Sequence, residues 1–134
     1  MTELDRVVSA AYASEGKQED VNKVYLALLR GVLFLPVQKD HVATDEEPFS
    51  PLFTRVEKNY FMLTFDTLDR LTNWAGEQFE NMNYVELSGK DLVSGLGDNV
   101  YLVLNAGTDF HKEFSPDEIK QLKKIVARIE QLKG

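Results

Sequence analysis

The chain has 134 residues, a formal net charge of −7 and no cysteine. A chain of this length can bury one core, and we expect a single domain over residues 1–134. Without cysteine, disulfides, thiolate catalysis and zinc–cysteine sites are excluded. The negative charge argues against nucleic acid and against an anionic membrane as partners, because both bind clustered Lys and Arg. A polar N-terminal sequence and the lack of a long apolar run predict a cytoplasmic protein.

The first two elements are predicted to be helices. One apolar face of the first helix is made of Leu4, Val7, Val8 and Ala11. Thr2 is suited to cap this helix, and the residues recur with helical spacing. A second apolar face runs over residues 21–29, and Gly31 follows it as a stop signal. The polar break at residues 15–17 predicts that the two helices form a hairpin.

Strands are predicted to follow the two helices. Residues 32–37 form an apolar run, and the polar, breaker-rich residues 38–50 predict an exposed loop. Two more strands are predicted at residues 51–56 and 59–65, joined by a short turn.

The middle of the chain predicts alternating short helices and strands. Asp66 is expected to cap a helix that ends at Gly76. Alternation over residues 83–87 predicts a strand, and Ser88 is suited to cap the short helix that follows. Residues 100–105 form the clearest buried strand, because the run is apolar and rich in β-branched and aromatic residues.

The C-terminal part contains a strong helix start. Residues 106–109 have the composition of a turn, and residues 110–114 are expected to be extended. Residues 115–118 then combine a serine cap, a proline at the first helical position and a glutamate at the capping-box position. The last helix is expected to bury one face, made of Ile119, Leu122, Ile125 or Val126, Ile129 and Leu132.

The predicted element order is α-α-β-β-β-α-β-α-β-α. Strands cluster early and alternate with helices later in the chain. This pattern predicts an α/β (α+β) fold in which helices pack on a mixed sheet of about five strands.

Charge is unevenly distributed along the chain. Residues 112–134 hold six basic and four acidic side chains, which leaves a net charge of −9 on the rest of the chain. Cations are favoured near the C-terminal end of a helix, and a basic helix beside an acidic body can also steer a partner.

Known catalytic motifs do not fit the sequence. Residues 88–91 contain Gly-Lys but lack the first glycine and the hydroxyl residue of a phosphate-binding loop. Residues 95–97 lack the third glycine of a dinucleotide-binding motif. No serine lies in a nucleophile elbow, and His41 lies in the predicted loop, a poor place for a catalytic base. We therefore predict no enzymatic activity, no cofactor and no metal.

Asp109, His111 and Glu113 alternate along the predicted extended segment. On an extended chain they would point to one side and could host a weak metal site. An exposed strand edge commonly carries the same residue types, and we adopt that interpretation.

The turn after the buried strand is the segment most suited to bind a ligand or a partner. Its candidate residues are Asn105, Gly107, Thr108, Asp109 and His111. Open α/β sheets bind ligands at the carboxyl ends of their strands, and Gly107 permits close backbone approach. A tight turn needs the same residue types, so a purely structural role stays open.

Residues 102–119, LVLNAGTDFHKEFSPDEI, resemble the signature stretch of the SseB N-terminal domain family. That stretch is an apolar strand, Leu-Asn-Pro-Gly-Ser-Asp, and then Glu-Phe-Ser-Pro-Glu-Glu-Ile. Residues 51–54 and 84–92 resemble other recurring pieces, whereas Ala106 and Thr108 depart from the usual proline and serine. The resemblance implies an α/β fold and a bacterial, cytosolic setting, and it implies no reaction.

The sequence leaves more than one function open. The first is a non-enzymatic accessory or protein-interaction domain, whose partner is another protein or a second copy of the chain. The alternative is a domain that binds a small molecule, such as an amino acid or a related metabolite, through the turn of residues 105–109. An enzyme with an unrecognised site is the third.

Overall fold

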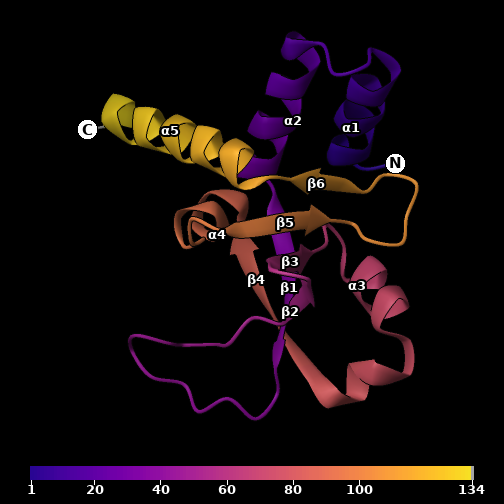
Figure 1. The fold of residues 1–134 in the computed structure, drawn as a ribbon, viewed down its shortest axis with the longest axis vertical. Coiled ribbons are helices and arrows are strands. Elements are labelled where there is room, and N and C mark those ends of the chain that lie inside the picture. Colours follow the sequence, from indigo (N-terminus) through magenta and orange to yellow (C-terminus); the bar gives the residue numbers. More distant parts are fainter. Residues whose placement is uncertain (134) are drawn as a thin grey trace.

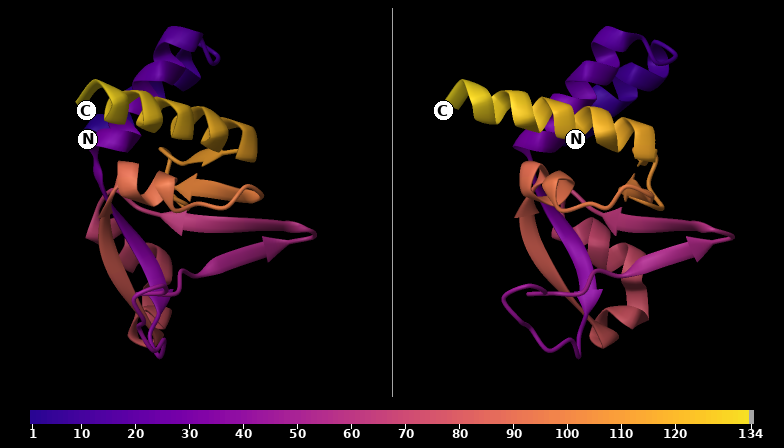
Figure 2. Two further views of the ribbon diagram at one scale, coloured as in Figure 1. Left: turned by 90° about the vertical axis from the view of Figure 1, so that its left-hand side faces the viewer. Right: turned by 60° about the vertical axis from the view of Figure 1, so that its left-hand side comes forward.

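The structure, a computed structural model, describes residues 1–133 (Figures 1 and 2). The helices are α1 (Glu3–Ala13), α2 (Gln18–Arg30), α3 (Leu68–Ala75), the 3-10 helix η1 (Gly76–Asn81), α4 (Gly89–Ser94) and α5 (Pro116–Lys133). The strands are β1 (Val32–Gln38), β2 (Phe53–Val56), β3 (Asn59–Thr64), β4 (Met82–Ser88), β5 (Val100–Leu104) and β6 (Lys112–Phe114). The predicted element order is confirmed, with η1 in addition and with β6 inside the segment that was predicted to be extended.

The helix starts predicted at Thr2, Ser88 and Ser115 are confirmed. The Thr2 hydroxyl accepts from the Asp5 N–H at 3.1 Å, and the Asp5 carboxylate accepts from the Thr2 N–H at 3.0 Å. The Ser115 hydroxyl accepts from the Glu118 N–H at 3.2 Å, and the Glu118 carboxylate lies 3.4 Å from the Ser115 nitrogen. The Ser88 hydroxyl caps α4. Each cap satisfies amide groups that have no partner inside the helix.

The strands form two sheets rather than the single sheet that was predicted. One sheet is antiparallel and the other is mixed. β1 pairs antiparallel with β4, and the second sheet has the order β2-β3-β5-β6, in which only β3 and β5 are parallel. Phe34 and Phe65 exchange two backbone hydrogen bonds of 2.7 and 2.9 Å, which join β1 to the end of β3. A second bridge joins Val37 to Pro51.

The main core is formed by helices α1, α2, α4 and α5 together with strands β1, β3, β5 and β6. Its fully buried side chains include Val8, Leu28, Leu33, Leu102, Leu104, Phe114, Ile119 and Leu122. A smaller cluster of Leu63, Phe65 and Leu71 lies under α3. In Figure 1, α1, α2 and α5 lie above β6, and α3 lies on the other side of β5. Helices therefore cover the sheet from two sides.

The predicted cap of α3 is wrong by one residue. Thr67, rather than Asp66, caps the helix, because the Thr67 hydroxyl accepts from the Arg70 N–H at 3.2 Å. The Asp66 carboxylate is engaged elsewhere, by the Arg70 guanidinium and the Thr2 hydroxyl.

Two predictions near the C-terminus also need correction. The extended segment predicted at residues 110–114 shrinks to β6, because the chain still turns through Phe110. Helix α5 buries Ile119, Leu122 and Val126 as expected, but Leu132 is 83% exposed. The last turns of α5 extend beyond the rest of the molecule, so Leu132 has no core to contact (Figure 1).

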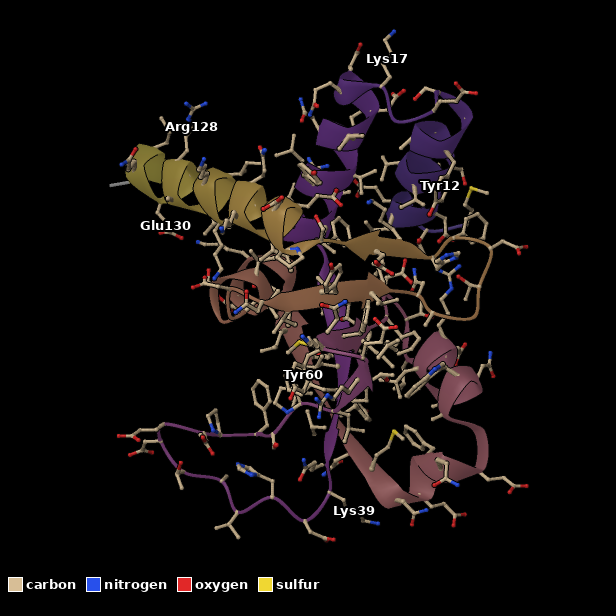
Figure 3. All side chains as sticks on the ribbon, viewed as in Figure 1. Tyr12, Lys17, Lys39, Tyr60, Arg128 and Glu130 are labelled. Atoms are coloured by element: carbon tan, nitrogen blue, oxygen red, sulfur yellow. The ribbon has the colours of Figure 1, made fainter. Side chains whose placement is uncertain are left out.

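Two oppositely charged side chains of α5 lie on different sides of the helix. Figure 3 shows Arg128 and Glu130 on different sides of the helix, and Glu130 pairs with Lys90 of α4. None of the helices in residues 1–133 has the length and apolar character needed to cross a lipid bilayer.

Candidate functional site

Asn105 directly follows β5, and its hydrogen bonds stabilise the turn that begins there. Its backbone is left-handed, with φ of 56°, and its side chain is completely buried. The Asn105 N–H donates to the Thr64 carbonyl at 2.8 Å, and the Asn105 carbonyl accepts from the Thr108 hydroxyl, also at 2.8 Å. The side-chain carbonyl of Asn105 accepts from the Asp66 N–H at 3.1 Å. Asn105 thus ties the turn to β3 and to the start of α3, out of reach of solvent.

The other predicted residues lie nearer the surface of the turn. Gly107 has φ of 81°, and no atom lies within 4 Å of the position that a Cβ would take. The Thr108 hydroxyl accepts from the Phe110 N–H at 3.1 Å. Asp109 and His111 are exposed, and a His111 ring nitrogen lies 3.3 Å from the Thr108 carbonyl. The five predicted residues are therefore not gathered around a single site.

Asp109, His111 and Glu113 do not share one side of a strand. Only Glu113 belongs to β6, because the chain turns at Asp109 and Phe110. Within the described residues 1–133, no three His, Asp or Glu side chains gather closely enough to hold a metal ion.

A buried cluster of Asp5, Asp66 and Arg70 was not predicted from the sequence. The Arg70 guanidinium donates to both Asp5 carboxylate oxygens at 2.7 Å and to the Asp66 carboxylate at 2.8 Å. The Asp66 carboxylate also accepts from the Thr2 hydroxyl at 2.6 Å. The spacing of four residues between Asp66 and Arg70 was a usable signal for that pair. Asp5 carries no such signal, because it lies 65 residues away in sequence.

Asp5 and Arg70 are both held in their charged forms. Burial raises the pKa of Asp5, but the Arg70 hydrogen bonds, the Thr2 hydrogen bonds and the Arg70 charge bring it below its ordinary value of 3.8. The hydrogen bonds to Asp5 raise the pKa of Arg70 against the effect of burial. The positive charge of the guanidinium is therefore neutralised by two carboxylates, so Arg70 is poorly suited to bind an anionic ligand.

A cavity of about 380 Å³ lies beside the turn. It is lined by Arg70, Asn73, Trp74, Ala106, Gly107 and Thr108. Arg70 lies over the Phe110 ring, 5.5 Å from its centre, and Trp74 is 38% exposed. Two of the predicted site residues, Gly107 and Thr108, thus reach this cavity.

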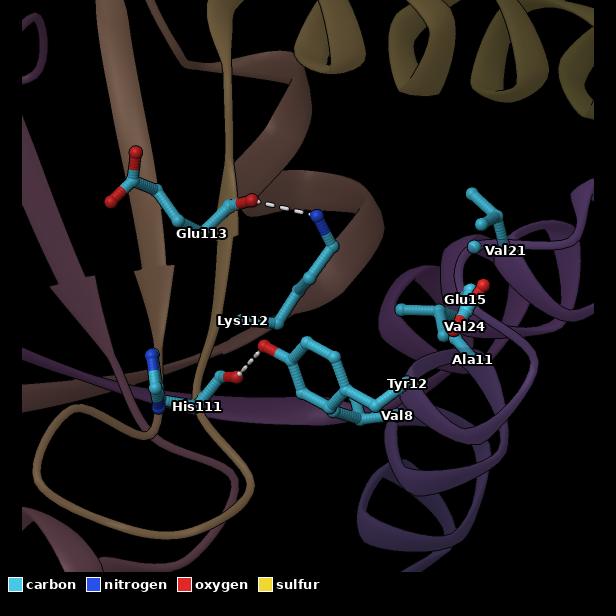
Figure 4. Close-up of a pocket in the computed structure, with 10 residues that line it drawn as sticks. Val8, Ala11, Tyr12, Glu15, Val21, Val24, His111, Lys112 and Glu113 are labelled. Atoms are coloured by element: carbon cyan, nitrogen blue, oxygen red, sulfur yellow. Dashed lines mark hydrogen bonds between the residues drawn. The ribbon is translucent and has the colours of Figure 1, made fainter.

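A second concavity, which we call the hairpin groove, lies between the α1–α2 hairpin and β6 (Figure 4). Its volume is about 320 Å³. The helices contribute Val8, Ala11, Tyr12, Val21 and Val24, the hairpin turn contributes Glu15 and Gly16, and the strand side contributes His111, Lys112 and Glu113. Helical periodicity predicted the apolar residues as core positions, but it could not tell that Ala11 and Val21 stay half-buried at an open edge.

Tyr12 reaches from α1 to the strand backbone, and Lys112 of β6 binds the backbone of its own strand. The Tyr12 hydroxyl donates to the His111 carbonyl at 2.5 Å, and burial raises the pKa of Tyr12, so the hydroxyl keeps its proton (Figure 4). The Lys112 ammonium donates to the Glu113 carbonyl at 2.8 Å and lies 3.2 Å from the Glu118 carboxylate. The groove is thus apolar along its helices and polar along its strand.

The sequence model of one family, the SseB protein N-terminal domain, matches residues 4–121. This span contains both walls of the hairpin groove, the Asp5 cluster and the turn after β5. A search of curated proteins and a search of solved structures found no match.

Proposed function

The chain belongs to the SseB protein N-terminal domain family, and from its hairpin groove we propose that it is a non-enzymatic protein-interaction domain. The observation that carries this proposal is an open groove of about 320 Å³ with an apolar wall and a polar border. Exposed apolar surface rimmed by polar groups is typical of protein–protein contact sites. A bacterial, cytoplasmic setting is part of the proposal, and the lack of cysteine fits a reducing compartment.

Two adjacent alanines of α1 provide a matched test. Ala11 is half-buried and lines the hairpin groove, whereas Ala10 is exposed on the same helix. We expect Ala11→Trp to fill the groove and to prevent partner binding, and Ala10→Trp to leave binding unchanged. The measurement is quantitative capture of proteins from a lysate of the source cells on the immobilised chain, with circular dichroism as a check of folding.

The predicted result is a protein retained by the wild type and by Ala10→Trp but lost with Ala11→Trp. A protein that binds Ala11→Trp as well as it binds the wild type would contradict a role for the groove.

The cavity beside the turn supports a second candidate function, small-molecule binding. Gly107 and Thr108 supply backbone and hydroxyl groups there, and the half-exposed Trp74 supplies a flat apolar surface. An amino acid or related metabolite is the class of ligand that we expect. A ligand that binds only the folded state raises the melting temperature. A thermal-shift screen should then find a compound that stabilises the wild type but not Trp74→Ala, and the absence of any such compound argues against this candidate.

A further inference from the structure

We propose that the hairpin groove takes an extended, apolar peptide segment of a partner protein, with one basic residue, which pairs with the free edge of β6 as a fifth strand. This inference rests on the proposed function. It adds the conformation and the chemistry of the partner segment.

The backbone of Glu113 faces away from the sheet. The Asn105 N–H points to β3. The N–H and C=O groups of successive residues in a strand point in opposite directions. The N–H and C=O groups of Leu104 therefore point to β6. Leu104 pairs with Lys112, whose backbone groups therefore face β5. Glu113 is the next residue, so its N–H and C=O groups face outward, toward the α1–α2 hairpin.

A new strand would displace two side chains from this edge, because the Tyr12 hydroxyl donates to the His111 carbonyl and the Lys112 ammonium donates to the Glu113 carbonyl. The Glu113 carbonyl accepts from the flexible Lys112 ammonium, and no hydrogen bond within residues 1–133 uses the Glu113 N–H. An antiparallel segment would pair with both groups at once, as strand addition requires. A helical segment in the groove would leave both groups without a backbone partner, at the cost of burying unpaired polar atoms. The edge therefore selects an extended conformation.

The opposite wall of the groove selects apolar side chains. Ala11 and Val21 are half-buried on this wall, whereas Val8 and Val24, which also line it, are almost completely buried. Side chains of an extended segment alternate, so every second residue would point to this wall. A groove of about 320 Å³ accommodates a few such side chains.

Charge at the border selects a basic residue. The Glu15 carboxylate is exposed in the hairpin turn, and no described residue pairs with it. The Lys112 ammonium is already paired with Glu118. The chain outside residues 112–134 has a net charge of −9, so the surrounding field also favours a cation.

A second copy of this chain is a poor occupant. Antiparallel pairing of two β6 strands through their free edges, in the register centred on Glu113, would place Glu113 directly opposite the Glu113 of the other copy. Like charges directly opposite on paired strands are destabilising. We assign the groove to a segment of a different protein, and dimerisation of the chain through β6 would overturn the inference.

Glu113 also offers the sharpest test. Glu113→Pro removes the outward N–H without removing a hydrogen bond to β5, and proline is tolerated on edge strands. Glu113→Ala is the matched control, because it removes the carboxylate and keeps the N–H. The probes are linear peptides selected from a random library on the wild-type chain, with calorimetry as the measurement of affinity.

Selected peptides should carry apolar residues at alternate positions and a Lys or Arg. We expect Glu113→Pro to weaken their binding about tenfold or more, and Glu113→Ala to leave it within about twofold. N-methylation of the backbone of the same peptides should weaken binding to the wild type by a similar factor.

A measurement on the wild type removes any dependence on how the proline variant folds. In the complex, hydrogen exchange of the Glu113 amide should become slower. An unchanged exchange rate, equal binding to Glu113→Pro and Glu113→Ala, or a library that gives no binding peptide would overturn the inference. If Ala11→Trp still blocks a protein partner in that case, the interaction function stands and only the strand pairing fails.

Discussion

The Arg70 guanidinium holds two carboxylates that come from different elements. Asp5 belongs to the first turn of α1 and is fully buried, and Asp66 precedes α3. A buried carboxylate that loses its partner keeps its desolvation cost, which is why broken buried pairs are strongly destabilising. This cluster therefore fixes α1 to α3, and with α1 it fixes one wall of the hairpin groove.

Removal of Arg70 should lower the free energy of unfolding by about 3–5 kcal/mol, because Asp5 is then buried without a counter-charge. The variant is Arg70→Met, and urea unfolding is the measurement. Arg30→Met is the control, since Arg30 pairs with Glu3 at the surface, where both side chains are more than half exposed. Such a pair contributes less than about 1 kcal/mol. Equal effects of the two substitutions would contradict the role of the cluster.

The depressed pKa of Asp5 predicts a pH dependence of stability. The folded-state pKa lies below the ordinary value of 3.8, so this contribution is present above that value and is lost as the pH falls through the folded-state pKa. Asp5→Asn should destabilise the protein at about pH 7, and its stability should fall less steeply below about pH 4 than that of the wild type. Urea unfolding across this range is the measurement, with the exposed Asp69→Asn as control. Parallel curves for Asp5→Asn and the wild type would be the contrary result.

At the scale of elements, helix α4 packs closely on α2 because Gly89 has no side chain. The Gly89 N–H donates to the Gly31 carbonyl at 2.9 Å, and a Cβ at this position would overlap the Leu28 carbonyl oxygen. The backbone of a buried helix cannot shift without disturbing its neighbours, so the approach of α4 to α2 needs glycine.

Gly89→Ala should therefore destabilise the protein by about 3 kcal/mol, because overpacking forces α4 away from α2. Gly97→Ala is the control: the nearest atom to its Cβ would be Val100 Cγ2 at 3.9 Å, an ordinary contact. Thermal unfolding of both variants decides the matter. A Gly89→Ala protein as stable as Gly97→Ala would show that α4 is free to move.

Most elements could be predicted from the sequence because their signals are local. Thr2, Ser88 and Ser115 carry their caps within three residues, and apolar spacing places both helices of the hairpin. The candidate site depended on distant contacts and was harder to predict. The Asp5–Arg70 pair and the hydrogen bond from Tyr12 to His111 join residues 65 and 99 positions apart, and nothing in the spacing of a sequence encodes such contacts.

At the scale of the whole molecule, the hairpin groove exists because the α1–α2 hairpin stands beside a very short edge strand. β6 has three residues, and the groove lies between this strand and the two helices. The same architecture places the cavity of the turn on the far side of the loop between β5 and β6. The two candidate functions therefore use different surfaces and can be separated by experiment.

The most direct test is to map the amide resonances of the labelled wild-type chain during titration with a captured partner or a selected peptide. Our account predicts that the largest changes occur at Ala11, Val21 and Glu113, the residues on the two walls of the hairpin groove. Changes confined to Trp74, Gly107 and their neighbours, with the groove resonances unmoved, would contradict it.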